Sequence, residues 1–240
     1  MSDTDPRAVA LDVLLRVEGG AHSDRALDRA LRRARLDDRD RRLTTELVYG
    51  TLRRLQTLDR NIGPHCHRPL QELDAPVRVA LRLGLYQCCF LDSVPEHAAV
   101  NVVVAAVKRY KPQAAGLVNG VLRACLRAGS LTSPAADDDL ARRCDLPAWW
   151  ARRWQDRHGE EAAGRWLERA LQAAPLVLRP HPRVLGAEEL CRSLASEGVR
   201  LAPAGHCPGA FLVMKGSPLA TSAFAAGCFS LRGEASQMII

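Results

Sequence analysis

The sequence has 240 residues, which is enough for two domains of ordinary size, and it is 47% hydrophobic but only 5% aromatic. An apolar content of mostly Ala, Leu and Val predicts a mainly helical protein and argues against a β-sandwich. The formal net charge of +7 favours polyanionic or acidic partners, and the lack of any run of about 18 apolar residues excludes a membrane-spanning helix.

The positive charge is concentrated in the front half of the chain. Residues 1–128 contain 21 Lys and Arg against 15 Asp and Glu, whereas residues 129–240 contain 13 against 12. The first ten residues, MSDTDPRAVA, are acidic and polar, unlike a secretory signal peptide, which begins basic and continues apolar. A cytoplasmic location is therefore expected, and the eight cysteines are interpreted as reduced thiols rather than as a disulfide framework.

In the front half, apolar residues recur at helical spacing between clear stop signals, which predicts six helices joined by short connections. The first helix is expected to open at Asp5, with Pro6 in its first turn, and to close at Gly19 and Gly20. The other helices are expected to begin after Ser23, to cover 41–62 with a bend near Gly50, to cover 77–90, to run from Pro95 to about residue 111, and to cover 114–127. Together they predict a compact helical bundle over residues 1–128.

Basic side chains gather at several places in this bundle and are candidates for binding polyanion phosphates. Arg suits this role because its planar guanidinium donates two parallel hydrogen bonds to phosphate. Aspartates such as Asp24 and Asp28 alternate with these residues, so an ordinary salt-bridged surface is the alternative interpretation. The sequence does not rank the cluster at 25–33 against the cluster at 108–111. The candidates are Arg25, Arg29, Arg32, Arg33, Arg53, Arg54, Lys108, Arg109 and Lys111.

The composition changes after residue 128. Residues 129–145 begin with the Ser-, Pro- and Asp-rich stretch GSLTSPAADDD and are expected to form a linker. Residues 146–240 are expected to form two helices and then a small α+β subdomain, whose order of strand, helix, strand, strand, helix, strand is that of ferredoxin-like domains. Three of the four tryptophans of the two helices, at helical spacing, are expected to form a packing seam rather than a base-stacking surface. The four tryptophans are Trp149, Trp150, Trp154 and Trp166.

The sequence shows few signs of catalytic chemistry. It contains no glycine-rich nucleotide-binding loop, no His-Glu-x-x-His and no Cys-x-x-Cys pair. His65, Cys66 and His67 lie in a proline-flanked turn where successive side chains diverge, which favours a solvated turn over a metal site. Cys207, beside His206, has no acid or oxyanion donor near it in the sequence and is interpreted as an ordinary loop cysteine. No catalytic, cofactor-binding or metal-binding residue is therefore assigned.

Three segments resemble one protein family in their sequence, order and spacing. They are ELVYGTLRRLQTLD at 46–59, LGLYQCCFLDSVPEHAAVNVVVAAVKRYKP at 83–112 and GLVNGVLRACLR at 116–127. They resemble the NusB-like N-terminal domain of the RsmB (Sun/Fmu) ribosomal RNA cytosine-C5 methyltransferases. The later segments LPAWWARRWQDRHG, APLVLRPHPR and FSLRGEASQM resemble the intermediate helices and small α+β subdomain of that family. The resemblance implies a NusB-like bundle at 1–128 and, at 146–240, a connector and ferredoxin-like subdomain.

In this family, a catalytic domain that binds S-adenosylmethionine follows the EASQ segment, and its active-site cysteines occur in Pro-Cys and Thr-Cys contexts. None of the eight cysteines here has these neighbours, since Cys207 precedes a proline instead of following one. Methylation of cytosine C5 needs a thiolate, a base and a bound methyl donor in one pocket. The chain alone is therefore expected to be inactive, to bind no cofactor and to be a truncated form of such an enzyme.

Three functions are compatible with these features, and none involves a membrane. In the first, the chain is the part of a ribosomal RNA methyltransferase that engages the RNA. In the second, it is a NusB-like regulator of transcription antitermination that binds RNA together with a ribosomal protein. In the third, the bundle is a protein-interaction module and its charge serves only solvation. Affinity for ribosomal RNA that falls steeply with salt would favour the first hypothesis.

Overall fold

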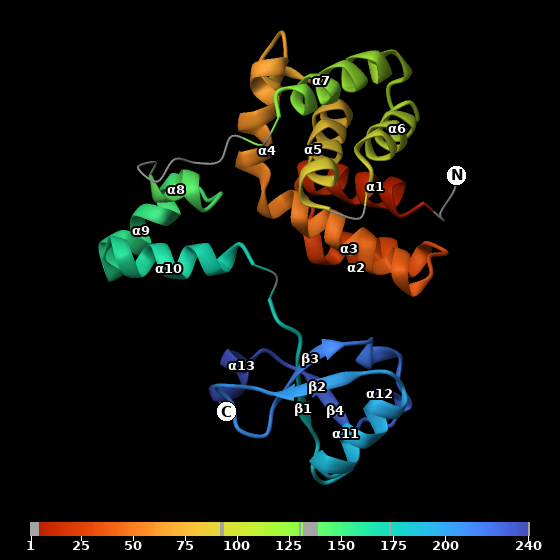
Figure 1. Cartoon of the computed structure of the whole chain (residues 1–240), viewed down its shortest axis with the longest axis vertical. Coiled ribbons are helices and arrows are strands. Elements are labelled where there is room, and N and C mark those ends of the chain that lie inside the picture. Colours follow the sequence, from red (N-terminus) through yellow and green to blue (C-terminus); the bar gives the residue numbers. More distant parts are fainter. Residues whose placement is uncertain (1–4, 92–93, 130, 132–138, 173, 240) are drawn as a thin grey trace. The chain divides into compact units, whose positions relative to one another are not determined.

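The computed structural model of the chain describes residues 5–91, 94–129, 131, 139–172 and 174–239. The chain divides into two compact units, residues 1–171 and residues 172–240 (Figure 1). The first unit is helical, and the second contains a four-stranded sheet. Among the described residues, no helix combines the length and the hydrophobicity that crossing a bilayer requires.

Seven helices form the bundle at the front of the first unit. They are α1 (Pro6–Glu18), α2 (Ser23–Arg33), α3 (Asp38–Arg53), α4 (Leu55–Ile62), α5 (Ala75–Phe90), α6 (Glu96–Val107) and α7 (Ala115–Arg127). The start of α1 confirms the prediction, because the Asp5 side chain accepts a hydrogen bond from the backbone N–H of Arg7 and Pro6 occupies the first turn. The mainly helical fold predicted from composition is thus confirmed.

Two predicted helix boundaries are wrong. The predicted helix over 41–62 is divided into α3 and α4 at Arg54, not bent at Gly50, and α6 ends at Val107 rather than near residue 111. Gly50 lies inside α3 for a different reason: a Cβ built on it would lie 1.9 Å from the Tyr86 hydroxyl oxygen. The glycine therefore permits close contact between α3 and α5, and gives no bend.

Helix α5 is the centre of the bundle and contacts α1, α3, α4, α6 and α7 (Figure 1). Residues 79–87 of α5 are all buried, as its nearly continuous apolar sequence predicts. Large side chains that are fully buried, such as Leu81, Leu85 and Leu122, form the core between α5 and α7 with Leu58 of α4. This core excludes water from a charged residue in the same helix, Arg82.

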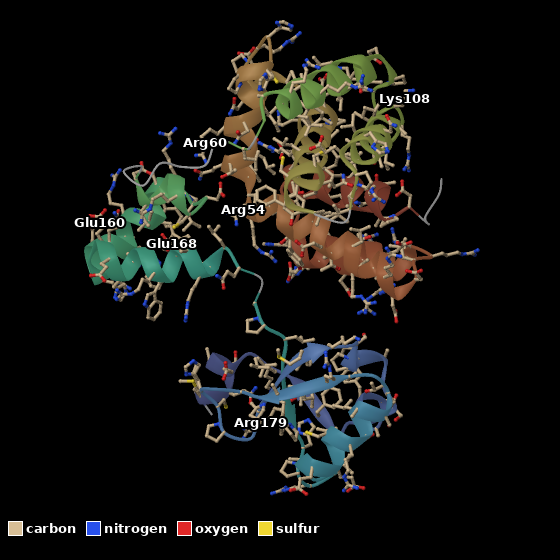
Figure 2. The ribbon with its side chains drawn as sticks, viewed as in Figure 1. Arg54, Arg60, Lys108, Glu160, Glu168 and Arg179 are labelled. Atoms are coloured by element: carbon tan, nitrogen blue, oxygen red, sulfur yellow. The ribbon has the colours of Figure 1, made fainter. Side chains whose placement is uncertain are left out.

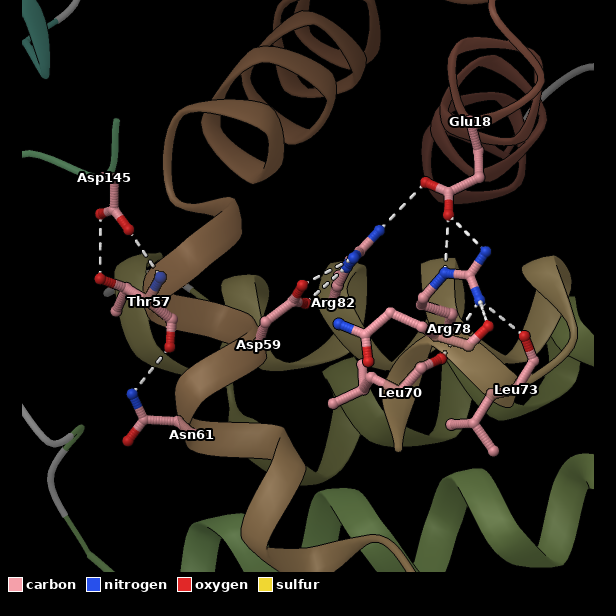
Figure 3. A network of polar contacts seen from close by, with 10 residues as sticks. Glu18, Thr57, Asp59, Asn61, Leu70, Leu73, Arg78, Arg82 and Asp145 are labelled. Atoms are coloured by element: carbon pink, nitrogen blue, oxygen red, sulfur yellow. Dashed lines mark hydrogen bonds and ion pairs between the residues drawn. The ribbon is translucent and has the colours of Figure 1, made fainter. Parts of the chain in front are cut away.

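Arg82 is 8% exposed and connects three helices through its guanidinium (Figure 3). It binds Asp59 of α4 through two hydrogen bonds of 2.6 and 2.7 Å, and it donates a third of 3.0 Å to Glu18 at the end of α1. The other Glu18 oxygen accepts a hydrogen bond of 2.6 Å from Arg78. Arg78 also donates to the backbone carbonyls of Leu70 and Leu73, which orders the chain before α5. Charge pairing therefore fixes α1 and α4 on α5.

Replacing Arg82 with Ala should destabilise the fold strongly, because Asp59 would lose its bidentate partner in a mostly buried position. The expected loss in the free energy of unfolding is about 3 kcal/mol, measured by urea denaturation. Arg32→Ala is the matched control: it removes an ion pair with Asp28 whose side chains are 76% and 62% exposed, so no measurable loss is expected. Equal stability of Arg82→Ala and the wild type would contradict the role of this network.

Three short helices complete the first unit: α8 (Leu140–Arg143), α9 (Ala148–His158) and α10 (Glu160–Ala170). They share a small core of Leu140, Cys144, Ala151, Ala163 and Leu167. The segment predicted as a linker, 129–145, therefore contains one helix, whereas residues 130 and 132–138 lie outside the described residues. The predicted domain boundaries stay predictions.

Asp145, in the turn between α8 and α9, caps the start of α4. Its carboxylate accepts hydrogen bonds from the backbone N–H of Thr57 at 2.6 Å and from the Thr57 hydroxyl at 2.9 Å, and it lies 3.5 Å from the Arg54 guanidinium. The Asp145 side chain is 1% exposed, and its backbone has a φ of 52°, a left-handed conformation that Asp tolerates better than most residues. A residue distant in sequence thus supplies the helix cap that Arg54, the residue before α4, does not provide.

Replacing Asp145 with Ala should reduce stability by about 1–2 kcal/mol, because the first turn of α4 would lose its cap. Asp145→Asn is the matched comparison: its amide oxygen can still accept one hydrogen bond from Thr57 and it also tolerates the left-handed backbone, so a smaller loss is expected. Thermal unfolding followed by circular dichroism measures both. Equal effects of the two substitutions would show that the hydrogen bonds to Thr57 contribute little.

The predicted packing seam of three tryptophans is wrong, because two of the four are largely exposed. Trp149 is 67% exposed and Trp166 is 63% exposed, so they do not form an internal packing seam. The reason is that small and aliphatic side chains, such as Ala151, Ala163 and Leu167, already fill the space between α9 and α10. The large rings consequently lie on the outside of this helix pair.

The second unit confirms the predicted ferredoxin-like order. Its elements are β1 (Val177–Pro180), α11 (Ala187–Ser196), β2 (Arg200–Pro203), β3 (Phe211–Lys215), α12 (Ser222–Ala225), β4 (Phe229–Leu231) and α13 (Glu234–Met238). The strands pair antiparallel in the order β2-β3-β1-β4, with Val177 opposite Leu212 and Leu178 opposite Leu231. Leu190 and Leu194 of α11 pack on Leu178 and form the core of this unit.

Candidate nucleic-acid interface

A surface groove of about 270 Å³ lies between α1 and α2. Ala26, Ala30 and Ala34 line it at intervals of four residues along α2 and its end, and Val9 contributes from α1. Small side chains at this spacing leave one face of α2 open, since they project little from the helix. The groove is therefore a consequence of the alanine pattern of α2, with charged residues at its rim.

Three arginines line this groove: Arg16 of α1, and Arg29 and Arg33 of α2. All three are exposed, and none has a hydrogen bond or ion pair with another described residue. Their guanidinium groups are therefore available for external anions, and phosphate oxygens match their donor geometry. Arg29 and Arg33 were predicted from the sequence. Arg16 was missed because no second basic residue lies within one helical turn of it in the sequence, and the residue one turn before it, Asp12, is acidic.

The other two candidates of α2 differ from this pair. Arg25 is exposed but does not line the groove. Arg32 donates hydrogen bonds of 2.9 and 3.1 Å to Asp28, and this hydrogen bonding raises the pKa of its guanidinium. The interleaved aspartates of the sequence thus neutralise Arg32 and leave Arg29 and Arg33 uncompensated.

The cluster at 108–111 is connected to the same helix, α1. The Tyr110 hydroxyl donates a hydrogen bond to Asp12, which lines the groove. Lys108 (Figure 2) and Arg109 precede Tyr110 in this turn after α6, and the side chains of both are exposed without a polar partner among the described residues. Lys111 instead forms an ion pair with Asp74. The two clusters that the sequence did not rank therefore both adjoin α1.

The remaining candidates, Arg53 and Arg54, lie at the end of α3. Arg53 is half-buried. Arg54 (Figure 2) lies over the Phe90 ring, with 5.3 Å from its central carbon to the ring centroid, and forms the ion pair with Asp145. The structure thus gives Arg54 an internal role, and RNA contact by either residue stays a prediction.

The cysteines and histidines do not assemble into a reactive or metal-binding site within the part of the chain that the structure describes. No group of three His, Cys, Asp or Glu side chains there could hold a metal ion. Burial raises the pKa of the Cys88 thiol to about 12, and those of Cys89 and Cys125 to about 11, so these thiols are protonated at neutral pH. Cys207 is 5% exposed and packs against Val177, which makes it a packing residue of its loop.

Two family models match the chain, one behind the other. Residues 4–127 match the NusB family, and residues 146–220 match the ferredoxin-like domain of the RsmF/B-like methyltransferases. The crystal structure of PH0851 has a similar fold, with a TM-score of 0.68 and 17% sequence identity over 96% of this chain and 54% of that chain. The predicted combination of a NusB-like bundle and a ferredoxin-like subdomain is confirmed.

The most similar curated proteins include ribosomal RNA methyltransferases. The chain is 32% identical, over 100% of its length, to the probable ribosomal RNA small subunit methyltransferase B of Bacillus subtilis, and covers 54% of that protein. It is 40% identical, over 75% of its length, to the ribosomal RNA small subunit methyltransferase B of Thermus thermophilus, and covers 42% of it. The chain spans about half the length of these relatives. It belongs to the NusB family and is homologous to the N-terminal half of the RsmB ribosomal RNA methyltransferases.

Proposed function

We propose that this chain binds ribosomal RNA and holds it for methylation of a cytosine C5 atom. The observation that carries the proposal is the groove between α1 and α2, where Arg16, Arg29 and Arg33 have no ion-pair partner among the described residues. Relatives that are small-subunit ribosomal RNA methyltransferases supply the class of ligand. Such a ligand also implies a cytoplasmic location.

The chemistry of the groove suits the RNA backbone better than a specific base. Guanidinium groups bind phosphate through paired, charge-assisted hydrogen bonds, which fix the position of the nucleic acid without reading its sequence. Asp12 is the carboxylate among the groove residues, and the hydrogen bond from Tyr110 occupies it. The groove therefore presents a net positive charge to phosphate. Lys108 and Arg109 extend this charge along α1.

The described residues do not fit the methyl donor S-adenosylmethionine. Its usual binding site lies at the carboxyl ends of parallel strands, where a helix begins. The four strands described here are all paired antiparallel, and the groove in the bundle is lined by arginines, which would repel the sulfonium cation. We assign methyl transfer to the part of the relatives that this chain does not span.

Regulation of transcription is a second candidate function, and the match of residues 4–127 to the NusB family favours it. A regulator of this type would bind RNA together with a ribosomal protein. Copurification of a small ribosomal protein with the chain would support this function. A chain that binds ribosomal RNA alone, with unchanged affinity when that protein is added, would speak against it.

Replacing Arg29 and Arg33 together with Ala should weaken RNA binding and its salt dependence. Each lost phosphate contact should reduce the slope of log affinity against log salt by about 0.7, and two contacts by about 1.4. A gel-shift titration against small-subunit ribosomal RNA fragments at several salt concentrations measures this slope.

The matched control is the double substitution of Arg25 and Arg32 with Ala. It removes the same formal charge from the same helix but leaves the groove intact. The control should retain most of the wild-type affinity. Equal losses in both variants would mean that α2 acts only through its overall charge, and no loss in either would remove α2 from the interface.

A further inference from the structure

Helices α9 and α10 carry a cluster of aromatic rings in which Trp154 is partly buried against their shared core, while His158 and Trp166 are exposed. Trp154 and His158 of α9 lie against Trp166 of α10, with ring centroids 5.7 Å apart for the tryptophans and 5.0 Å apart for Trp154 and His158. His158 and Trp166 are nearly parallel, at 3° and 6.2 Å. Because Trp166 is 63% exposed, this aromatic cluster is open to solvent on the surface of the helix pair.

A second row of side chains lies next to this cluster on α9. Trp149, Arg153 and Arg157 follow one another at intervals of four residues and therefore share one face of the helix. All three are exposed, Trp149 by 67%. On α9 this row lies about 100° around the helix axis from the row of Trp154 and His158, because each of its arginines directly precedes one of those rings in the sequence. We call the two rows and Trp166 the α9 aromatic face.

The charges around this face favour a polyanion. Arg152, Arg153 and Arg157 have no hydrogen bond or ion pair with another described residue. In α10, by contrast, Glu161 pairs with Arg165, and Glu168 (Figure 2) pairs with Arg143. Asp156 of α9 and Glu160 of α10 also have no ion pair with another described residue, so the three arginines of α9 exceed these unpaired carboxylates by one positive charge.

We propose that the α9 aromatic face binds single-stranded RNA by stacking its bases on the exposed rings. The combination of open ring faces with unpaired arginines at neighbouring positions matches what single strands offer, which is unpaired bases beside phosphates. Trp and Arg are also enriched at protein–protein interfaces, so binding of a protein is the alternative that the experiment must separate from RNA binding. The proposal rests on the proposed RNA-binding function and adds a second contact, outside the bundle, that is selective for unpaired bases.

The chain offers a direct probe of this contact, because all four of its tryptophans lie in α9 and α10. Titration with a single-stranded RNA of about 12 nucleotides, within the usual site size for single strands, should quench the tryptophan fluorescence. The same RNA annealed to its complement should bind the bundle groove without this quenching, since its bases are already paired.

Substitutions at Trp149 and at the two arginines measure separately what the aromatic ring and the positive charge contribute to binding. Trp149→Ala should weaken binding of the single strand about tenfold, the size of one lost base stack, and Trp149→Phe should restore it to within about threefold. The double substitution of Arg153 and Arg157 with Ala should weaken binding of the single strand and reduce its salt dependence. All three positions are exposed, and circular dichroism verifies that each variant is folded.

The outcomes distinguish this proposal from the groove proposal. Loss of single-strand affinity in the α9 variants, with duplex affinity unchanged, supports it. Unchanged affinity in the α9 variants, or RNA binding without quenching, overturns the proposal that this face stacks RNA bases. A protein is then the expected ligand of the α9 aromatic face. If Arg29→Ala with Arg33→Ala has no effect while the α9 variants do, the groove proposal fails and this one stands. A wild-type chain that binds no RNA refutes both.

Discussion

The bundle depends on the burial of one charged side chain, Arg82, in the middle of its central helix. A guanidinium in that position must be paired, and the two carboxylates that pair with it come from the end of α1 and from α4. The position of α1 is consequently fixed against α5, and α1 in turn forms one wall of the groove that contains Arg29 and Arg33. The position of one wall of the groove therefore depends on an ion pair inside the bundle.

Some arginines of the first unit stabilise the fold through internal ion pairs and hydrogen bonds. Others have no such partner among the described residues and are available to bind external anions. Arg82 and Arg54 bind carboxylates of distant segments, and Arg7 donates to the buried amide of Gln87. The groove arginines and those of α9 have no such partners among the described residues. The net charge of +7 therefore does not locate an RNA-binding surface by itself, because arginines in internal ion pairs contribute as much to it as exposed, unpaired arginines do.

Local signals in the sequence predicted most of the helices, but neither the division of residues 41–62 into two helices nor the contacts between helices. Caps and stop signals such as Asp5 act within one turn of the chain, and the strand order of the second unit follows from apolar segments separated by turns. The cap of α4 comes from Asp145, and the function of Gly50 depends on Tyr86, so neither is visible locally. Arg16 was missed for the same reason, since only the fold places it beside α2.

The cap that Asp145 supplies has a consequence for the order in which the protein matures on the ribosome. The hydrogen bonds to Thr57 span 88 residues of sequence. Synthesis proceeds from the N-terminus, so α4 emerges long before the side chain that completes its first turn exists. The early bundle therefore lacks this cap until the turn before α9 has left the exit tunnel.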